Sequence, residues 1–323
     1  MVLALREVGW AVEVCRLDGA WPQPDAAELA GAAARIAALA DGTLVVADGL
    51  AFGTLAEVVA PHAARLRWVA LVHHPLHLES GLSDAARRQL LANETHALLH
   101  ARHLVVPSPA TAIDVAAMGV SPAHITVVEP GTDPVPMAVR PPREGPLRLL
   151  CVATLTPRKG HSLLLQALAG LMHLDWELHN VGSAMRDPAT AEHLRLLAAP
   201  LGARVFWHGE VNEQALHAHY ADADVFVLAS LHEGFGMVIT EALAHGLPVV
   251  ASDAGALAQT LPGGAGLQVP AGEVAPLQVA LAHILSDAGL RERLGAGARA
   301  AAEQLPTWPQ QALLLARALE RVA

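Results

Sequence analysis

The sequence predicts an α/β protein with two domains, each organised around a doubly wound parallel sheet. The chain has 323 residues, which is enough for two domains of roughly 100–200 residues each. Short apolar runs alternate with alanine-rich helical stretches along most of it, the pattern of consecutive strand–helix–strand units. Between them, residues 133–146 are rich in proline and lack apolar periodicity, so we expect a linker there.

Composition and charge exclude several classes of protein. With 53% hydrophobic and 16% charged residues, the chain can bury two cores and is not intrinsically disordered. Its net charge of −10 argues against nucleic acid, which needs a basic surface, and weakens without excluding peripheral contact with an anionic membrane. We find neither an apolar stretch of about 20 residues that could cross a membrane nor a signal-peptide pattern. We therefore expect a cytoplasmic protein.

The first domain is predicted over residues 1–132. Residues 2–9 are typical of the end of a helix that runs into a strand. Cys15 and Cys151 lie in strand-like runs, so we expect both to be buried free thiols. Strands are expected at residues 11–17, 43–47, 68–73, 103–106 and 125–128, and helices at 26–39, 54–65, 83–100 and 110–118.

Two adjacent histidines, His73 and His74, end one of these apolar strands. Ligand sites in open α/β sheets lie beyond the carboxyl ends of the strands, so either side chain is placed to meet a ligand. A zinc site that adds His77 is the alternative hypothesis. It is disfavoured because adjacent side chains diverge and the sequence shows no further ligand.

The second domain is predicted over residues 147–305, and residues 306–323 form a C-terminal segment with a last helix. As in the first domain, apolar runs alternate with helical stretches. Strands are expected at residues 147–154, 177–181, 204–210, 225–228, 248–251 and 265–270, and helices at 163–168, 216–221, 237–245, 275–285, 290–303 and 310–321.

A basic pair, Arg158 and Lys159, follows the first strand of this domain directly. A guanidinium fork and an ammonium group at a strand-to-helix turn are suited to bind phosphate oxygens. Further on, Gly182 ends the next strand.

A glycine-bearing turn, residues 233–236, opens the helix predicted at 237–245. The free N–H groups at the start of a helix attract anions, and glycine lets the backbone come close to them. Glu233 and Glu241 flank this site, and carboxylates beside a phosphate are better suited to bind hydroxyl groups. The combination predicts a site for a sugar nucleotide.

These two glutamates stand eight positions apart around Gly234, Phe235 and Gly236, and residues 242–252 continue as an apolar helix and strand. The whole string resembles the paired-glutamate signature of retaining glycosyltransferases with the GT-B fold, the family-four or group 1 type. The resemblance implies two Rossmann-like domains facing a cleft. It also implies that residues 306–323 cross back to the first domain.

The resemblance further implies a role for each candidate residue. Arg158 and Lys159 would hold the donor diphosphate, Glu241 the ribose hydroxyls and Glu233 the hydroxyls of the transferred sugar. His73 would act with Glu233 in catalysis, and His74 is a second candidate on the acceptor side. The remaining donor-binding positions are Gly182, Gly234, Phe235, Gly236 and Met237.

The predicted function is therefore transfer of a sugar from a nucleoside-diphosphate sugar to an unidentified acceptor, with no cofactor and no metal ion. The string Asp222-Ala223-Asp224 is typical of metal-dependent transferases of another fold, but it precedes a strand, and we interpret it as a turn. One departure from the family is the lack of its first strand and glycine-rich loop before residue 2. Two alternatives stay open. A sugar-nucleotide epimerase or hydrolase could have the same fold, and the departure just described leaves open a truncated nucleotide-sugar-binding protein without catalysis.

Overall fold

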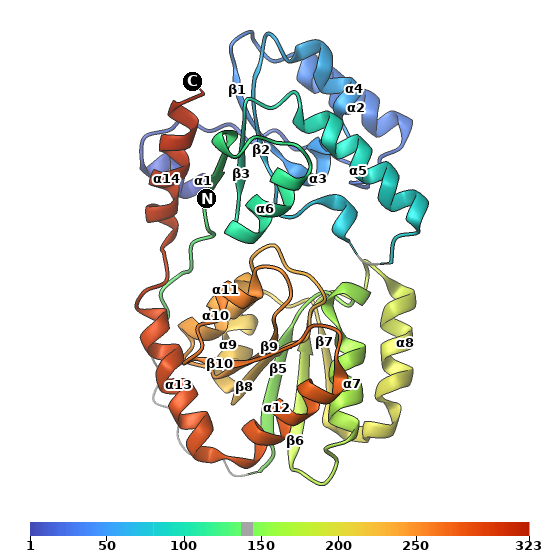
Figure 1. Ribbon diagram of the computed structural model, residues 1–323, viewed down its shortest axis with the longest axis vertical. Coiled ribbons are helices and arrows are strands. Elements are labelled where there is room, and N and C mark those ends of the chain that lie inside the picture. The colour runs from blue at the N-terminus through green and yellow to red at the C-terminus, as the bar shows by residue number, and fades with distance from the viewer. Residues whose placement is uncertain (80, 137–144, 323) are drawn as a thin grey trace. The chain divides into compact units, whose positions relative to one another are not determined.

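The computed structural model describes residues 1–79, 81–136 and 145–322, and its contacts divide the chain into two compact units (Figure 1). Unit 1 comprises Met1–Gly131 together with Pro306–Ala323, and unit 2 comprises Thr132–Leu305. Most of the predicted linker, residues 137–144, lies outside the described residues. No helix in the described parts of the chain is long and apolar enough to cross a membrane.

Unit 1 is built on a four-stranded parallel sheet in the order β1-β2-β3-β4. Its strands are β1 (Leu44–Asp48), β2 (Arg67–Leu71), β3 (His103–Val106) and β4 (Ile125–Val127). Its helices are α1 (Val2–Glu7), α2 (Ala26–Ala37), α3 (Gly49–Phe52), α4 (Ala56–Val59), α5 (Asp84–Leu98), α6 (Pro109–Ala117) and α14 (Trp308–Glu320).

Both faces of this sheet are covered, because successive side chains of a strand point to opposite faces. Trp68 and Leu104 point into a core shared with α2, α4, α5 and α6. Their neighbours Val69 and Val105 point the other way and pack with α1 and α14, where Leu315 is buried. The C-terminal helix is thus part of the core of unit 1.

The strand predicted at residues 11–17 is wrong. The backbone there is irregular, Val14 is 57% exposed, and Cys15 is exposed, which also corrects its expected burial. A strand needs a neighbour to receive its backbone hydrogen bonds, and no described strand of unit 1 pairs with these residues. By contrast, Cys151 is buried as predicted.

Unit 2 is built on a six-stranded parallel sheet in the order β10-β9-β8-β5-β6-β7. Its strands are β5 (Leu147–Val152), β6 (Trp176–Val181), β7 (Val205–Gly209), β8 (Val225–Leu228), β9 (Val249–Ser252) and β10 (Gly266–Val269). Its helices are α7 (His161–Ala169), α8 (Pro188–Ala198), α9 (Glu213–Asp222), α10 (Met237–Ala244), α11 (Leu257–Thr260), α12 (Val274–Ser286) and α13 (Ala288–Ala302).

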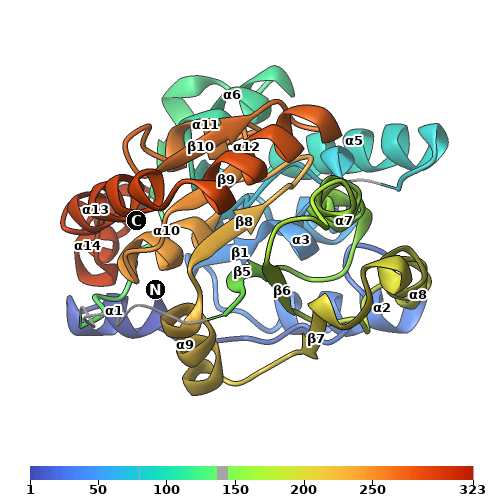
Figure 2. The same ribbon diagram turned by 90° about the horizontal axis from the view of Figure 1, so that it is seen from below.

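The first strand of unit 2, β5, lies in the middle of the sheet. From it the chain adds β6 and β7 on one side and then β8, β9 and β10 on the other. Figure 2 shows α7 and α8 on one side of the sheet and α9 and α10 on the other. The winding direction reverses between β5 and β8, and the carboxyl ends at such a point are where open α/β sheets bind ligands.

Candidate functional site

Two loops meet at the carboxyl ends of β5 and β8. The first contains the short 3-10 helix η4 (Pro157–Lys159) and presents Arg158 and Lys159. The second runs from residue 229 to Gly236, where α10 begins. The strand order therefore brings together the basic pair and Glu233, although 74 residues separate Lys159 from Glu233.

Gly160 holds these two loops against each other. Its φ is +66°, and a Cβ there would lie 1.9 Å from the carbonyl oxygen of Ala229. Beside it, the N–H of Leu231 donates to the carbonyl of Arg158 at 2.7 Å. Only a residue without a side chain fits a left-handed backbone conformation with so close a contact.

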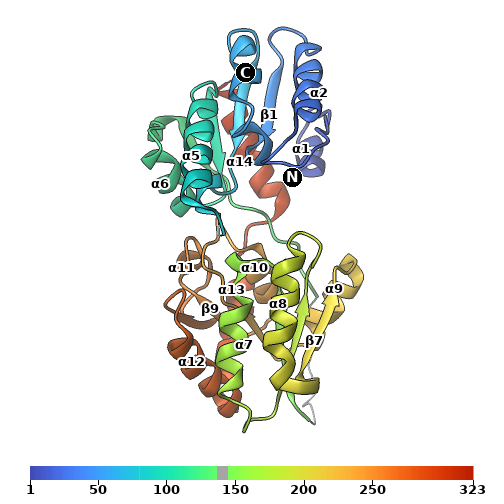
Figure 3. The same cartoon turned by 90° about the vertical axis from the view of Figure 1, so that its right-hand side faces the viewer.

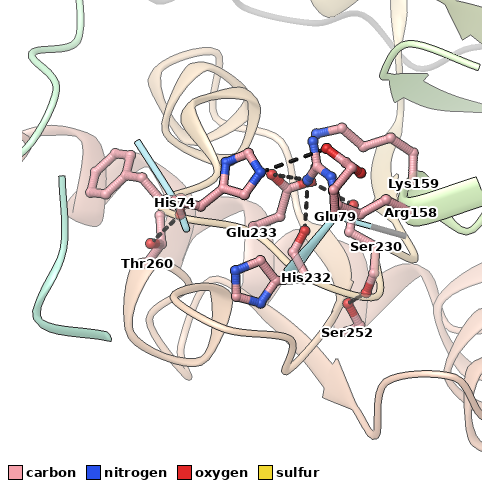
Figure 4. A network of polar contacts seen from close by, with 10 residues as sticks. His74, Glu79, Arg158, Lys159, Ser230, His232, Glu233, Ser252 and Thr260 are labelled. Atoms are coloured by element: carbon pink, nitrogen blue, oxygen red, sulfur yellow. Dashed lines mark hydrogen bonds and ion pairs between the residues drawn. The ribbon is translucent and has the colours of Figure 1, made fainter. Parts of the chain in front are cut away.

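Glu233 is buried and receives polar groups from both loops. Figure 4 shows Lys159, Arg158 and Ser230 around its carboxylate. Lys159 Nζ and Ser230 Oγ donate to Oε1 at 2.5 Å and 2.7 Å, and Arg158 lies 3.3 Å from Oε2. Behind this network, Ser252 Oγ on β9 donates to the carbonyl of Ser230 at 2.5 Å.

The charges around Glu233 favour its ionised form. Burial alone would raise the pKa of this carboxyl, but Lys159 and Arg158, with hydrogen bonds from Lys159 and Ser230, outweigh burial and hold the pKa below its usual value. One carboxylate thus faces two cations. These cations at the carboxyl ends of β5 and β8 are suited to bind an anionic ligand.

The start of α10 adds a second group of anion-binding donors. Gly236 has a φ of +91° and precedes the helix, and Met237 is its first residue. The first N–H groups of a helix have no partner within it, so they are able to bind an anion. Phe235 is buried, and its carbonyl accepts a 2.6 Å hydrogen bond from Thr260 Oγ1, which fixes the turn before the helix.

Glu241 lies further along α10 itself and has a different environment. Its Oε2 accepts a 2.7 Å hydrogen bond from the hydroxyl of Tyr220 on α9. Burial raises its pKa, although the hydrogen bond from Tyr220 acts against this. The two glutamates of the sequence motif therefore have separate partners, and no contact recorded among the described residues joins them.

Gly182 is positioned by the sheet. Its N–H donates to the carbonyl of Gly209 on β7 at 2.8 Å. A Cβ at this position would lie 2.0 Å from the carbonyl oxygen of Ala153. Glycine is required here by the packing of the strand ends, whether or not a ligand approaches.

In unit 1, the two predicted histidines have acidic neighbours. His73 Nε2 lies 3.1 Å from Oδ2 of Asp48 at the end of β1, and both side chains are more than half exposed. His74 Nε2 lies 3.6 Å from Oε2 of Glu79. His77 is not part of either pair, so the alternative zinc site of His73, His74 and His77 has no support in this geometry.

In each unit, some residues that contact the candidate residues or their neighbours were not predicted from the sequence. Ser230 follows β8 closely, and Ser252 is the last residue of the neighbouring strand β9. A position at the carboxyl end of a strand is a signal that could have identified both residues. Asp48 likewise ends β1, next to the strand that leads to His73. Tyr220 gives no such signal, because it lies within a helix.

Comparison with known proteins supports a family assignment. Residues 137–301 match the family model described as Glycosyl transferases group 1. The phosphatidyl-myo-inositol mannosyltransferase of Mycobacterium leprae is 39% identical over 172 residues, covering 52% of this chain and 44% of that protein. The chain thus spans less than half the length of this relative.

A second relative matches over nearly the whole chain. The MMP alpha-(1->4)-mannosyltransferase of Mycolicibacterium hassiacum is 31% identical over 347 residues, covering 98% of this chain and 82% of that protein. Among solved structures, the sucrose-phosphate synthase of Thermosynechococcus elongatus superposes with a TM-score of 0.73 at 26% identity, covering 86% of this chain and 73% of that one. The predicted GT-B class, with two parallel-sheet α/β domains, is confirmed.

Proposed function

This chain belongs to the group 1 glycosyl transferases, and we propose that it transfers a sugar from a nucleoside-diphosphate sugar with retention of the anomeric configuration. The observation that carries the proposal is the meeting of Arg158, Lys159 and Glu233 at the reversal point of the unit 2 sheet. Such a cluster offers cations for a diphosphate and a carboxylate for sugar hydroxyls in one place.

The charges of Arg158, Lys159 and Glu233 suggest how the donor would bind. Without a ligand, Arg158 and Lys159 both interact with Glu233. A diphosphate that enters from the α10 side would bind these cations and the helix N–H groups. Glu233 would then share its cations and be free to accept hydrogen bonds from the sugar.

In the proposed reaction, the bond between the anomeric carbon and the diphosphate oxygen breaks while the acceptor oxygen attacks the same face. The acceptor proton passes to the leaving phosphate oxygen, and Arg158 and Lys159 stabilise the negative charge that develops there. Glu241 would bind the ribose hydroxyls. The catalytic role of His73 and the acceptor-side role of His74 remain proposals from the resemblance.

The proposal assigns neutralisation of the diphosphate to protein side chains and therefore includes no metal ion or cofactor. We propose a hexose donor. Two relatives named as mannosyltransferases make a mannose nucleotide the first candidate to test, with glucose nucleotides second. The acceptor is unidentified, and we place the protein in the cytoplasm.

The proposal is tested by incubating the purified chain, in chelator, with GDP-mannose or UDP-glucose and a panel of alcohol and sugar acceptors. We expect a glycoside whose anomeric configuration, read by NMR, matches that of the donor. Lys159→Ala should weaken nucleotide binding in calorimetry, and Glu233→Gln should reduce turnover more than binding. Free sugar or an epimer as the sole product would contradict transfer, and nucleotide binding without turnover on any acceptor would indicate a binding protein.

A further inference from the structure

Three histidines of unit 2 converge on one face of the sheet at its β7 edge. They are His179 on β6, His208 on β7 and His219 on α9, and one ligating nitrogen from each lies within 4.8 Å of the other two. His179 Nδ1 is 3.0 Å from His208 Nε2, and the ring centroids of His208 and His219 are 4.3 Å apart. Figure 3 shows β7 leading into α9 at this edge.

The ring of His179 is fixed on two sides. Phe206 stacks on it with the ring centroids 4.7 Å apart and an interplanar angle of 15°. Its Nε2 lies 3.4 Å from Oε2 of Glu177, two residues earlier on the same face of β6. A carboxylate can only accept a hydrogen bond, so this contact places the proton of the His179 ring on Nε2. The lone pair of His179 Nδ1 is then directed at His208.

We propose that His179, His208 and His219 bind a divalent transition-metal ion, with zinc the first candidate. Zinc takes imidazole nitrogens at about 2.0–2.1 Å in a tetrahedral arrangement, which separates the nitrogens by about 3.3 Å. Small side-chain rotations bring the three nitrogens from their present separations to that value. Water would complete the four ligands, since three histidines leave one position open.

The neighbouring groups are those of a metal site. A metal-bound histidine usually donates its other N–H to a carboxylate, which is the position of Glu177 relative to His179. Arg148 adds positive charge nearby, 3.6 Å from Glu177, but it also pairs with Asp222 at 3.2 Å. Glu177 and Asp222 thus place two carboxylates beside this guanidinium.

The histidines also favour the form that binds metal. Burial, aided by neighbouring histidines, lowers the pKa of both His208 and His219. Without metal, the 3.0 Å contact requires a proton on Nε2 of His208, donated to His179. Metal binding would move that proton to Nδ1 of His208 and leave the Nε2 lone pair for the ion.

A metal ion here would serve a structural role. It would join the edge strand β7 to its neighbour β6 and to α9, whereas Arg158, Lys159 and Glu233 lie on the loops after β5 and β8. Tyr220, the residue after His219, contacts Glu241. The ion would therefore hold α9, the helix that positions the proposed ribose-binding carboxylate.

The experiment is a calorimetric titration of the chelator-treated full chain with zinc chloride. His208→Gln and His219→Gln each remove one ligand from an incompletely buried position, so both variants should fold. His193→Gln is the matched control, because His193 is an exposed histidine of α8 in the same unit. Cobalt substitution adds a second readout, since tetrahedral cobalt gives visible absorption bands.

We expect one zinc ion per chain, binding at least about tenfold more weakly in His208→Gln and His219→Gln and unchanged in His193→Gln. Zinc should raise the melting temperature of the wild type and of His193→Gln only. Equal affinity in wild type and His208→Gln would overturn the proposal. An equal loss in His193→Gln would show unspecific binding by surface histidines and would overturn it as well.

Discussion

The hydroxyl of Tyr220 donates a 2.7 Å hydrogen bond to Oε2 of Glu241, joining α9 to α10. Tyr220 is fully buried, and its ring stacks on His245 with the centroids 4.8 Å apart. Glu241 is the residue to which we assign the ribose hydroxyls. Its orientation therefore depends on a residue that makes no proposed contact with the donor.

Tyr220→Phe tests this dependence, because it removes the hydrogen bond and keeps the ring. We expect the free energy of unfolding to fall by about 1.5–3 kcal/mol, as for loss of a hydrogen bond to a carboxylate. Nucleotide affinity should fall several-fold, measured by calorimetry with UDP and GDP, with Glu241→Gln for comparison. A loss of stability with unchanged affinity would restrict Tyr220 to folding.

Lys159→Met should destabilise unit 2 in a pH-dependent way. In the wild type the pKa of Glu233 is lowered, so its ionisation adds stability above the ordinary carboxyl range, and this is lost as the pH falls through the lowered pKa. Without Lys159, Arg158 is the one cation among the described residues that still pairs with the buried carboxylate. We expect the free energy of unfolding, measured with urea, to fall by about 2 kcal/mol at pH 7. This difference from the wild type should become smaller toward pH 4.

The double variant Lys159→Met with Glu233→Gln is the control for that experiment. It removes the buried charge together with its partner, so most of the stability at pH 7 should return. If the double variant is as unstable as Lys159→Met, packing of the lysine stem rather than the uncompensated carboxylate is responsible.

The sequence predicted the paired strands well and one unpaired segment wrongly, for a single physical reason. Buried parallel strands are continuously apolar, so β8 and β9 are recognisable from their own residues. The run at residues 11–17 is also rich in apolar residues, although Glu13 and Arg16 interrupt it. Whether a neighbour exists to receive its hydrogen bonds is a property of the sheet and is not encoded in those residues.

The same limit applies to the site. Arg158, Lys159 and Glu233 could be placed together because strand ends of one parallel sheet meet at one edge. The contact of Tyr220 with Glu241 could not, since it depends on how α9 packs beside α10. Likewise, three histidines spread over 41 residues show no metal spacing along the chain, and only the sheet brings them together.

Glu94→Gln should change how stability depends on pH. Glu94 is buried on α5, accepts the N–H of Leu76 at 2.7 Å, and has no partner for Oε1 among the described residues. Burial raises its pKa from 4.5 to about 7. A raised carboxyl pKa means that the folded state favours the protonated form, so stability is lost as the pH rises from about 4.5 to about 7.

The glutamine variant keeps the acceptor for Leu76 and cannot ionise. Relative to the wild type we expect it to gain up to about 3 kcal/mol between pH 4.5 and pH 8. Thermal and urea unfolding over this range measure the difference. Parallel pH profiles for the two proteins would show that Glu94 titrates normally.

Asp48→Asn tests whether His73 needs its acidic neighbour. The hydrogen bond from His73 is the main cause that lowers the pKa of Asp48, so a carboxylate faces the imidazole near neutrality. Asparagine still accepts a hydrogen bond from the Leu50 N–H that caps α3 but removes the negative charge beside the imidazole. We expect kcat to fall by about tenfold, less than the 10²–10⁴ of a lost acid–base group, while donor affinity stays constant. A fall in donor affinity alone would contradict the assignment of His73 to the chemical step.

Gly182→Ala separates two reasons for a glycine at a strand end. We assigned Gly182 to donor binding, yet its φ of +156° and the 2.0 Å approach of a Cβ to the carbonyl of Ala153 already require glycine. The substituted backbone must shift away from β5, and overpacking of this kind costs about 1–3 kcal/mol. We therefore expect lower stability in urea unfolding even without nucleotide. If stability is unchanged and only nucleotide affinity falls, the strand ends can adjust, and the glycine serves the ligand.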